Sequence, residues 1–207
     1  MQKENTKEEF WNNSYTNGMK YRQFENDQVE FYIKNKYIHG DILDIGCGAG
    51  EFSIALAKQG LNVMGVDISD IAIDKAKYNA AQANVKIEFI VGDIDTILIK
   101  NNINSNNNIQ SINHDAGMYD TVSCKLVYAF INDKVDFLNK VKLLLKKDGT
   151  LFISTPVITE ENKDKVLKPK ICITIDDIKF LKVQFKNVLQ INIGSNAYGD
   201  EYIIVCN

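Results

Sequence analysis

The chain contains the stretch Ile42-Leu43-Asp44-Ile45-Gly46-Cys47-Gly48-Ala49-Gly50-Glu51, in which a short apolar run ends in three alternating glycines. A run of this kind, bounded by glycines, is typical of a strand buried on both faces. The residues that follow place Phe52, Ala55 and Leu56 at helical spacing, which predicts a helix from Glu51 to Gln59. The stretch therefore predicts a strand, a glycine-rich loop and a helix in succession.

Expected strands and helices alternate along the rest of the chain. Further strands are predicted at Val63–Asp67, Val85–Val91, Tyr119–Cys124 and Thr150–Thr155, and further helices after Ser69, over Asp133–Lys147 and from Thr174 to Phe185. This alternation is the pattern of βαβ units around a parallel sheet. Two closing strands, Val188–Ile193 and Tyr202–Cys206, are joined by too few residues for a crossover, so one edge strand should run antiparallel. The prediction is a Rossmann-like α/β fold: a seven-stranded, mostly parallel sheet with helices on both faces and a C-terminal antiparallel hairpin.

The length of 207 residues suits one domain, with a main body over residues 41–207. Residues 1–40 are expected to be helical, with a second helix from Asp27 to Tyr37. Residues 101–118 interrupt the alternation, and seven of these eighteen residues are Asn. Between a surface insertion and a substrate lid, the sequence favours the insertion, because a polar tract without aromatic residues makes a poor lid.

Composition narrows the class of protein. The net charge of −3 lacks the strongly basic footprint of a dedicated nucleic-acid-binding protein. The four cysteines form no CxxC pair, which argues against a zinc site and a disulfide framework. No stretch reaches the roughly 20 apolar residues of a membrane span, and no signal peptide is visible. We therefore expect a cytoplasmic protein without a membrane partner, and nucleic acid is disfavoured as a partner.

The glycine loop favours one class of nucleoside cofactor. Dinucleotide enzymes use G-x-G-x-x-G with a pyrophosphate at the helix N-terminus, whereas the spacing here is G-x-G-x-G. Asp44 and Glu51 flank the loop, and two carboxylates would repel a pyrophosphate. They suit a cofactor that carries an ammonium group and a sulfonium, which favours S-adenosylmethionine over NAD. Asp67 ends the second expected strand, where a carboxylate can accept hydrogen bonds from both ribose hydroxyls.

Several ordered motifs resemble one known family. Leu43–Gly50 resembles motif I of the class I S-adenosylmethionine-dependent methyltransferases, and Asp67, Gly92-Asp93 and Leu144–Leu151 fall where that family has its later motifs. The resemblance covers roughly Ile42 to Thr155, apart from the Asn-rich insertion. It implies that S-adenosylmethionine is the cofactor and that residues 1–40 form a helical cover over it.

The resemblance also implies roles for single residues. The expected cofactor-binding residues are Gly46, Cys47, Gly48 and Gly50 in the loop, Asp44 at the amino group, Asp67 at the ribose, Ile68, Asp93 and Ile94 at the adenine, and Cys124 beside the methionine and the reacting methyl. Each aspartate also has a plain structural interpretation, since Asp67 could cap a helix and Asp93 could stabilise a turn.

Methyl transfer requires little beyond alignment and exclusion of water, so no strong catalytic signature is expected. The candidates are Lys125 and Tyr128 for catalysis, and Tyr15, Tyr21, Arg22 and Phe130 for binding the acceptor. Tyr128 and Phe130 have the alternative of being core residues. Lys125 stands near the place where metal-dependent relatives carry an Asp, so we expect no metal.

The function predicted from the sequence is metal-free methyl transfer to a small-molecule acceptor. The alternatives are a methyltransferase acting on RNA or protein, and a non-catalytic cofactor-binding protein of the same fold.

Overall fold

The computed structural model describes residues 6–18, 26–94, 117–164, 166, 168–196 and 199–207. Most of the predicted Asn-rich insertion, together with Tyr21 and Arg22, lies outside these residues.

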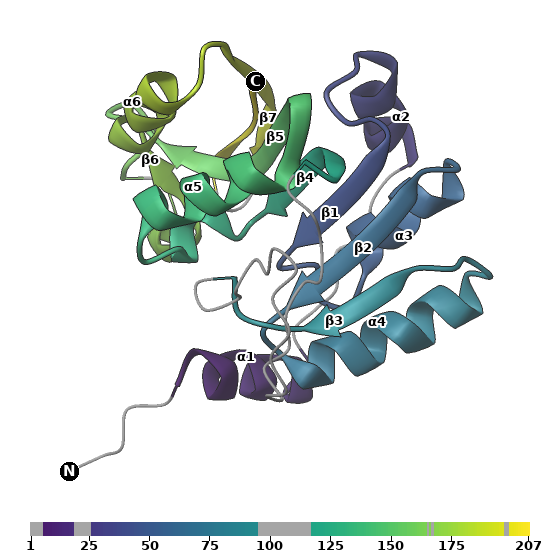
Figure 1. The fold of residues 1–207 in the computed structure, drawn as a ribbon. Coiled ribbons are helices and arrows are strands. Elements are labelled where there is room, and N and C mark those ends of the chain that lie inside the picture. The colour runs from purple at the N-terminus through teal and green to yellow at the C-terminus, as the bar shows by residue number, and fades with distance from the viewer. Residues whose placement is uncertain (1–5, 19–25, 95–116, 165, 167, 197–198) are drawn as a thin grey trace.

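One twisted sheet organises the chain (Figure 1). Its strands are β1 (Asp41–Ile45), β2 (Asn62–Asp67), β3 (Glu88–Val91), β4 (Tyr119–Lys125), β5 (Leu145–Ile158), β6 (Ile173–Thr174), β7 (Val188–Asn196) and β8 (Gly199–Cys206). The spatial order is β3-β2-β1-β4-β5-β8-β7, and β6 pairs with β5 beside this path. Strands β1 to β5 pair in parallel, whereas β8 is antiparallel to both β5 and β7.

The predicted fold is confirmed, with two differences in the sheet. The antiparallel strand is β8, which lies one position in from the edge, and β7 is the edge strand. The two-residue strand β6 was not predicted, because its residues carry no alternating pattern long enough to recognise.

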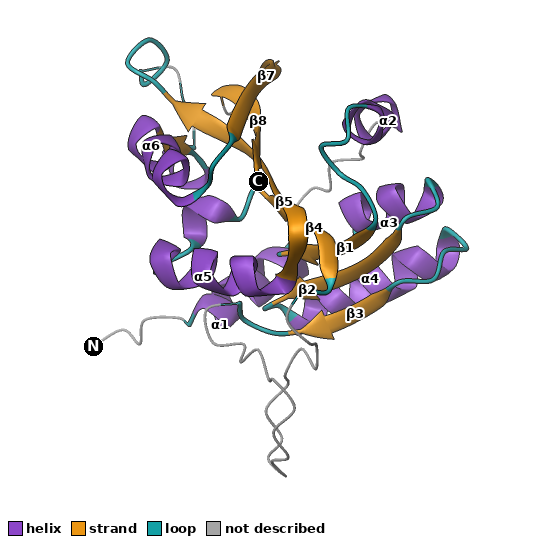
Figure 2. Cartoon of the chain, turned by 45° about the horizontal axis from the view of Figure 1, so that its top comes forward, coloured by secondary structure: helices purple, strands orange, loops and turns teal. Residues whose placement is uncertain are grey.

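Helices flank the sheet on both faces (Figure 2). They are α1 (Lys7–Thr16), α2 (Asn26–Lys34), α3 (Glu51–Lys58), α4 (Asp70–Gln82), α5 (Lys134–Leu144) and α6 (Ile175–Gln184), with the short 3₁₀ helices η1 (Tyr128–Phe130) and η2 (Pro169–Ile171). None of the helices that the structure describes has the length and apolar character needed to span a membrane.

The two faces of β1 explain why Ile42, Leu43 and Ile45 are all apolar. Leu43 and Ile45 pack into a core cluster with α5 and α6, while Ile42 packs into a second cluster with α2 and α3. A third, smaller cluster lies between α4, the glycine loop and Phe89 of β3. Because β1 is covered on both faces, the loop after it is held in a fixed position at the carboxyl edge of the sheet.

Helix starts agree with the capping signals in the sequence. The Thr6 hydroxyl and the Glu9 carboxylate form a capping box at α1, and Thr174 and Asp177 form another at α6. The Ser69 hydroxyl accepts a hydrogen bond from the amide of Ala72, which caps α4 as predicted.

Several predicted boundaries are wrong. Helix α5 ends at Leu144 rather than Lys147, and β5 begins at the next residue. The Asp148-Gly149 pair was predicted as the turn into a strand at Thr150, but it lies within β5, where Asp148 has a positive φ of 65° and the ladder to β4 shifts register. The pair forms a bulge, which a turn-forming dipeptide can also build. Strand β3 begins at Glu88 rather than Val85, and α2 ends at Lys34, before Lys36 turns left-handed with a φ of 57°.

Candidate functional site

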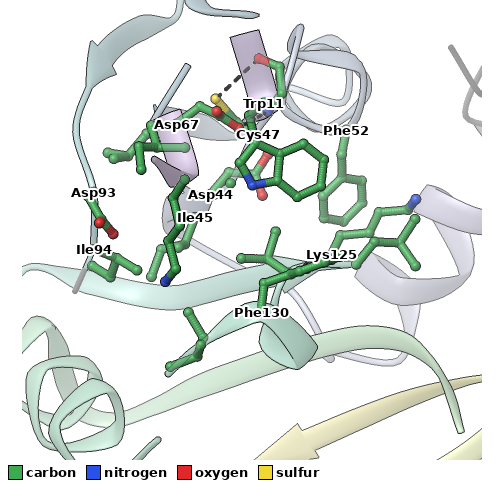
Figure 3. Close-up of a pocket in the computed structure, with 18 of the residues that line it drawn as sticks. Trp11, Asp44, Ile45, Cys47, Phe52, Asp67, Asp93, Ile94, Lys125 and Phe130 are labelled. Carbon is green, nitrogen blue, oxygen red and sulfur yellow. Dashed lines mark hydrogen bonds between the residues drawn. The ribbon is translucent and has the colours of Figure 1, made fainter. Parts of the chain in front are cut away.

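A pocket of about 300 Å³ opens at the carboxyl ends of β1 to β4 (Figure 3). This is the edge of an open α/β sheet where ligands bind. The volume lies at the lower end of the usual range for small-molecule sites. Most of its lining comes from the loop after β1, the ends of β2 and β4, the segment after β3, and helix α1.

The loop after β1 turns sharply beneath this pocket. The amides of Gly46 and Cys47 both donate to the carbonyl of Val66 on β2, across 2.7 and 3.0 Å. Gly46 has a φ of +66°, and a Cβ at this position would overlap the side chain of Val127. Glycine is required at position 46 for both reasons, which leaves the backbone exposed to a ligand.

Asp67 ends β2 and fixes the same loop from the other side. Its Oδ2 accepts from the amide of Gly48 at 2.8 Å, and its Oδ1 accepts from the amide of Ser69 at 2.9 Å. The residue is only 8% exposed, and burial raises the pKa of its carboxyl although these amides favour the charged form. Each carboxylate oxygen can accept more than one hydrogen bond, so Asp67 can also bind two hydroxyls from the pocket.

Asp44 lies at the floor of the pocket and is almost fully buried. Its Oδ2 accepts from the hydroxyl of Ser53 at 2.6 Å, and its Oδ1 accepts from the hydroxyl of Ser123 at 2.7 Å. Burial raises the pKa of Asp44 to about 6, while the two hydroxyls act in the opposite direction. Neither serine was predicted as a site residue, although Ser123 pairs directly with Asp44 in the β1–β4 ladder.

Glu51 is the first residue of α3 and also lines the pocket. Burial raises its pKa to about 8, and the nearby ammonium of Lys125 lowers it. Three carboxylates therefore share this part of the pocket, on Asp44, Glu51 and Asp67. They fit a cationic ligand, because a positive charge would stabilise their ionised forms.

Helix α1 lies against the pocket and contributes Lys7, Trp11 and Tyr15 to its lining. The indole of Trp11 meets the ring of Phe130 edge to face, with the ring centroids 5.1 Å apart. The hydroxyl of Tyr15 lies close to Gly48, which has no side chain in the way. The hydroxyl of Ser69 donates to the side chain of Asn12, which ties α1 to the N-terminus of α4. Lys7 and Trp11 were not predicted, although residues 1–40 were expected to cover the cofactor, because the sequence does not show which side chains of α1 face the pocket.

Eleven predicted site residues line the pocket. They are Tyr15, Asp44, Gly46, Cys47, Gly48, Asp67, Ile68, Asp93, Ile94, Lys125 and Phe130. In Figure 3, Asp67, Asp93 and Ile94 lie on one side of the view and Lys125 on the other, with the indole of Trp11 between them. The structure thus brings together residues from five separate segments of the chain.

Three predicted site residues do not line the pocket. Tyr128 is fully buried, packs against Phe137 of α5 and does not line the pocket. The short turn of η1 directs its ring into the core, whereas Phe130 two residues later faces the pocket. Cys124 is also fully buried, because side chains alternate along β4 and its neighbour Lys125 takes the pocket side.

Gly50 is the third of these residues. It does not line the pocket, and a Cβ there would lie 3.1 Å from the side chains of Ala76 and Phe89. The third glycine therefore allows α3 to begin close to α4 and β3, which is a packing role.

Two further observations bear on chemistry. All four cysteines are buried, and burial raises the pKa of Cys47, which leaves a thiol rather than a thiolate nucleophile at neutral pH. Within the described ranges, no group of three His, Cys, Asp or Glu side chains is arranged to hold a metal ion.

Comparisons with known proteins agree with this geometry. A family model described as "Methyltransferase domain" matches residues 39–193. The ubiquinone biosynthesis O-methyltransferase of Coxiella burnetii (strain Dugway 5J108-111) is 36% identical over 128 residues, which are 62% of this chain and 47% of that protein. The enzyme of the same name from Actinobacillus pleuropneumoniae serotype 7 is 32% identical over 114 residues, 55% of this chain and 44% of that protein. The chain spans about half the length of these curated relatives.

Solved structures share the fold. A SAM-dependent methyltransferase from Aquifex aeolicus superposes with a TM-score of 0.62 at 15% identity, covering 88% of this chain and 89% of that one. The magnesium protoporphyrin IX methyltransferase of Synechocystis PCC 6803, solved with bound S-adenosylmethionine, gives a TM-score of 0.60 at 20% identity, covering 88% and 77%. The family match over residues 39–193, together with the similarity to curated methyltransferases, leads to one assignment. The chain belongs to the class I S-adenosylmethionine-dependent methyltransferases.

Proposed function

We propose that the protein transfers a methyl group from S-adenosylmethionine to a small-molecule acceptor. The observation that supports this most directly is the buried Asp67 carboxylate, held by the amides of Gly48 and Ser69 at the edge of the pocket. A carboxylate fixed at the end of the second strand can bind a ribose through both hydroxyls. The acidic surroundings formed by Asp44 and Glu51 then match the ammonium and sulfonium charges of the same cofactor.

The remaining cofactor contacts follow from the positions of the side chains. Gly46, Cys47 and Gly48 would line the methionine portion through their backbone, because all three residues border the pocket. Ile68 would pack on the adenine, and Asp93 and Ile94 would border its amino edge.

Bound S-adenosylmethionine supplies an electrophilic methyl group on a sulfonium. An acceptor atom would take this methyl group with its own electron pair, which would leave the neutral thioether of S-adenosylhomocysteine, and a proton on that atom would be lost to solvent. The protein's part is to align the acceptor and exclude water, and Trp11 and Phe130 are placed to do both. We propose that no metal takes part, since Ser53 and Ser123 engage the carboxylate of Asp44, and Gly48 and Ser69 engage that of Asp67.

A small acceptor is supported over a macromolecule by the pocket itself. Its volume of about 300 Å³ lies in the range of small-molecule sites, and α1 lines one side of it. The curated relatives are named for a methyl transfer in ubiquinone biosynthesis, which is also a small-molecule reaction. The buried cysteines suit the reducing cytoplasm, where we place the protein.

Two measurements test the proposal. Isothermal titration calorimetry should show binding of S-adenosylhomocysteine and no binding of NAD, and the reverse result would overturn the cofactor assignment. Transfer of a radiolabelled methyl group into fractionated cell extract should then label the small-molecule fraction. Label in RNA or protein would replace the proposed acceptor class, and an absence of label in every fraction would favour a non-catalytic cofactor-binding protein.

A further inference from the structure

The part of the pocket where the proposed function puts the adenine is formed by a short segment after β3. Strand β3 ends at Val91, and the next three residues, Gly92, Asp93 and Ile94, all line the pocket. Figure 3 shows Asp93 and Ile94 next to each other on one wall. Because this segment lies beyond the end of the strand, its shape depends on contacts with other elements.

Two hydrogen bonds hold this segment from different sides. The amide of Gly92 donates to the carbonyl of Asp67 across 2.8 Å, which continues the pairing of β3 with β2 by one residue. The ammonium of Lys140 on α5 donates to the carbonyl of Ile94 across 3.2 Å. Asp93 therefore lies between two residues whose backbone is bound, one to β2 and the other to α5.

Lys140 is well shielded from water for a lysine. Its side chain is 16% exposed, and its ammonium also forms an ion pair with Asp136, one turn earlier on α5, across 2.8 Å. An ammonium with so little access to water needs polar partners, and the carbonyl of Ile94 is one of them. Lys140 does not line the pocket. It is therefore placed to act on the pocket through the backbone of Ile94 and not by touching a ligand.

The carboxylate of Asp93 gives the position of this segment a chemical consequence. A carboxylate can accept a hydrogen bond from the 6-amino group of adenine, but it repels the carbonyl oxygen that hypoxanthine carries at the same place. Such discrimination requires a fixed distance between the carboxylate and the base, since hydrogen bonds weaken steeply when their geometry is lost. The hydrogen bonds at Gly92 and Ile94 supply that constraint.

Resting on the proposed function, we propose that Lys140 is a positioning residue that makes the pocket specific for an amino-substituted purine. It holds the carbonyl of Ile94, and through it the carboxylate of Asp93, at the edge of the base. Without the ammonium of Lys140, the segment adopts the binding geometry only part of the time, and the apparent affinity for the cofactor falls by that fraction.

The test compares two ligands that differ only in the base. Calorimetry measures the binding of S-adenosylhomocysteine and of S-inosylhomocysteine, in which a carbonyl oxygen replaces the 6-amino group. The wild-type protein should bind the adenine compound about tenfold more tightly. Lys140→Met keeps most of the apolar side chain and removes the donor, so the affinity for S-adenosylhomocysteine should fall about 5-fold, while that for S-inosylhomocysteine should change by less than about 2-fold. Lys140→Arg keeps a charged donor and should restore most of the preference for adenine.

Two further variants of α5 serve as controls. Lys142→Met removes an exposed lysine whose ammonium donates to Gln184 of α6, and it should leave both affinities unchanged. Asp136→Asn breaks the ion pair of Lys140 but leaves its hydrogen bond to Ile94, so it should keep the preference for adenine. Should thermal denaturation show that Lys140→Met does not fold, Lys140→Gln, with its shorter side chain, takes its place.

The results separate the inference from the proposed function. Equal losses for the two ligands in Lys140→Met, the same selective loss in Asp136→Asn, or a failure of Lys140→Arg to restore the preference would overturn the inference while leaving the proposed function intact. Equal binding of the two ligands by the wild-type protein would do the same. Failure of the wild-type protein to bind S-adenosylhomocysteine would instead refute the proposed function, and the inference with it.

Discussion

The carboxylate of Asp67 at the end of β2 accepts a hydrogen bond from the amide of Gly48 across 2.8 Å, so one side chain holds the glycine loop in place. Its other oxygen accepts from Ser69, whose hydroxyl caps α4 and donates to Asn12 of α1. Asp67 therefore connects the loop, the helix after β2 and the helix that lies over the pocket. A ligand that binds Asp67 would find these three elements already positioned.

Removing this carboxylate should weaken cofactor binding strongly. Asp67→Ala is expected to cost about 2–4 kcal/mol in S-adenosylhomocysteine affinity, since two ribose hydroxyls lose a charged acceptor. Asp67→Asn keeps one acceptor oxygen, so its affinity for S-adenosylhomocysteine should lie between those of the wild type and Asp67→Ala. Calorimetry measures the affinities, and circular dichroism confirms that the variants are folded. Asp70→Ala removes an exposed carboxylate three residues away and should have no effect on affinity. A folded Asp67→Ala protein with wild-type affinity would exclude the ribose role.

Cofactor affinity should rise with pH through the neutral range. Burial raises the pKa of Asp44 to about 6 and that of Glu51 to about 8 in the free protein. A cationic ligand favours the ionised carboxylates, so protons must leave on binding and acid conditions oppose it. We expect S-adenosylmethionine to bind about 3- to 10-fold more weakly at pH 6 than at pH 8, with proton release visible in calorimetry across buffers.

Glu51→Gln is the control for that pH dependence. It removes the group with the higher pKa, so most of the change between pH 7 and 8 should disappear while the change near pH 6 remains. An identical pH profile in this variant would show that Glu51 does not face the bound cofactor.

Tyr128→Phe should leave turnover unchanged and should not destabilise the protein. The hydroxyl of Tyr128 is buried and has no hydrogen-bond partner among the described residues. Phenylalanine keeps the ring and removes the unpaired hydroxyl, so the free energy of unfolding should stay the same or rise by about 1 kcal/mol. Chemical denaturation and steady-state kinetics check this, with Tyr78→Phe at an exposed tyrosine as the neutral comparison. A fall in turnover without a loss of stability would show that the hydroxyl of Tyr128 takes part in the reaction.

Tyr128 and Phe130 show which features of the site could not be predicted from the sequence. The order of strands and helices was predictable because hydrophobic periodicity and capping residues are local signals. The glycine loop and Asp67 were predictable because parallel strands bring their carboxyl ends to one edge. The direction of a side chain in a three-residue 3₁₀ turn depends on backbone angles that no pattern encodes. For that reason the sequence could not distinguish Phe130, which lines the pocket, from Tyr128, which is buried in the core.

Contacts between segments that lie far apart in the sequence could not be predicted either. Ser53 and Ser123 became partners of Asp44 only through the packing of α3 and the register of β1 with β4. Trp11 lines the pocket because α1 packs near α4, where the hydroxyl of Ser69 donates to Asn12 and the ammonium of Lys75 donates to the carbonyl of Tyr15. Register and docking are set by the whole core, so a single segment cannot reveal them.

A double-mutant cycle can separate the two reasons for glycine at position 46. Gly46→Ala adds a Cβ that overlaps Val127 and places alanine at a φ of +66°, so S-adenosylhomocysteine binding should be largely lost. Val127→Ala removes the overlapping methyl groups and alone should weaken binding only slightly. In the double variant the overlap is relieved, but the left-handed backbone still costs alanine roughly 1–2 kcal/mol. Affinity should therefore recover in part, and the two changes should couple by at least about 1 kcal/mol. Calorimetry on the four proteins gives the coupling energy. Simple additivity would mean that Val127 does not press on the loop, and full recovery would mean that the backbone turn tolerates alanine without strain.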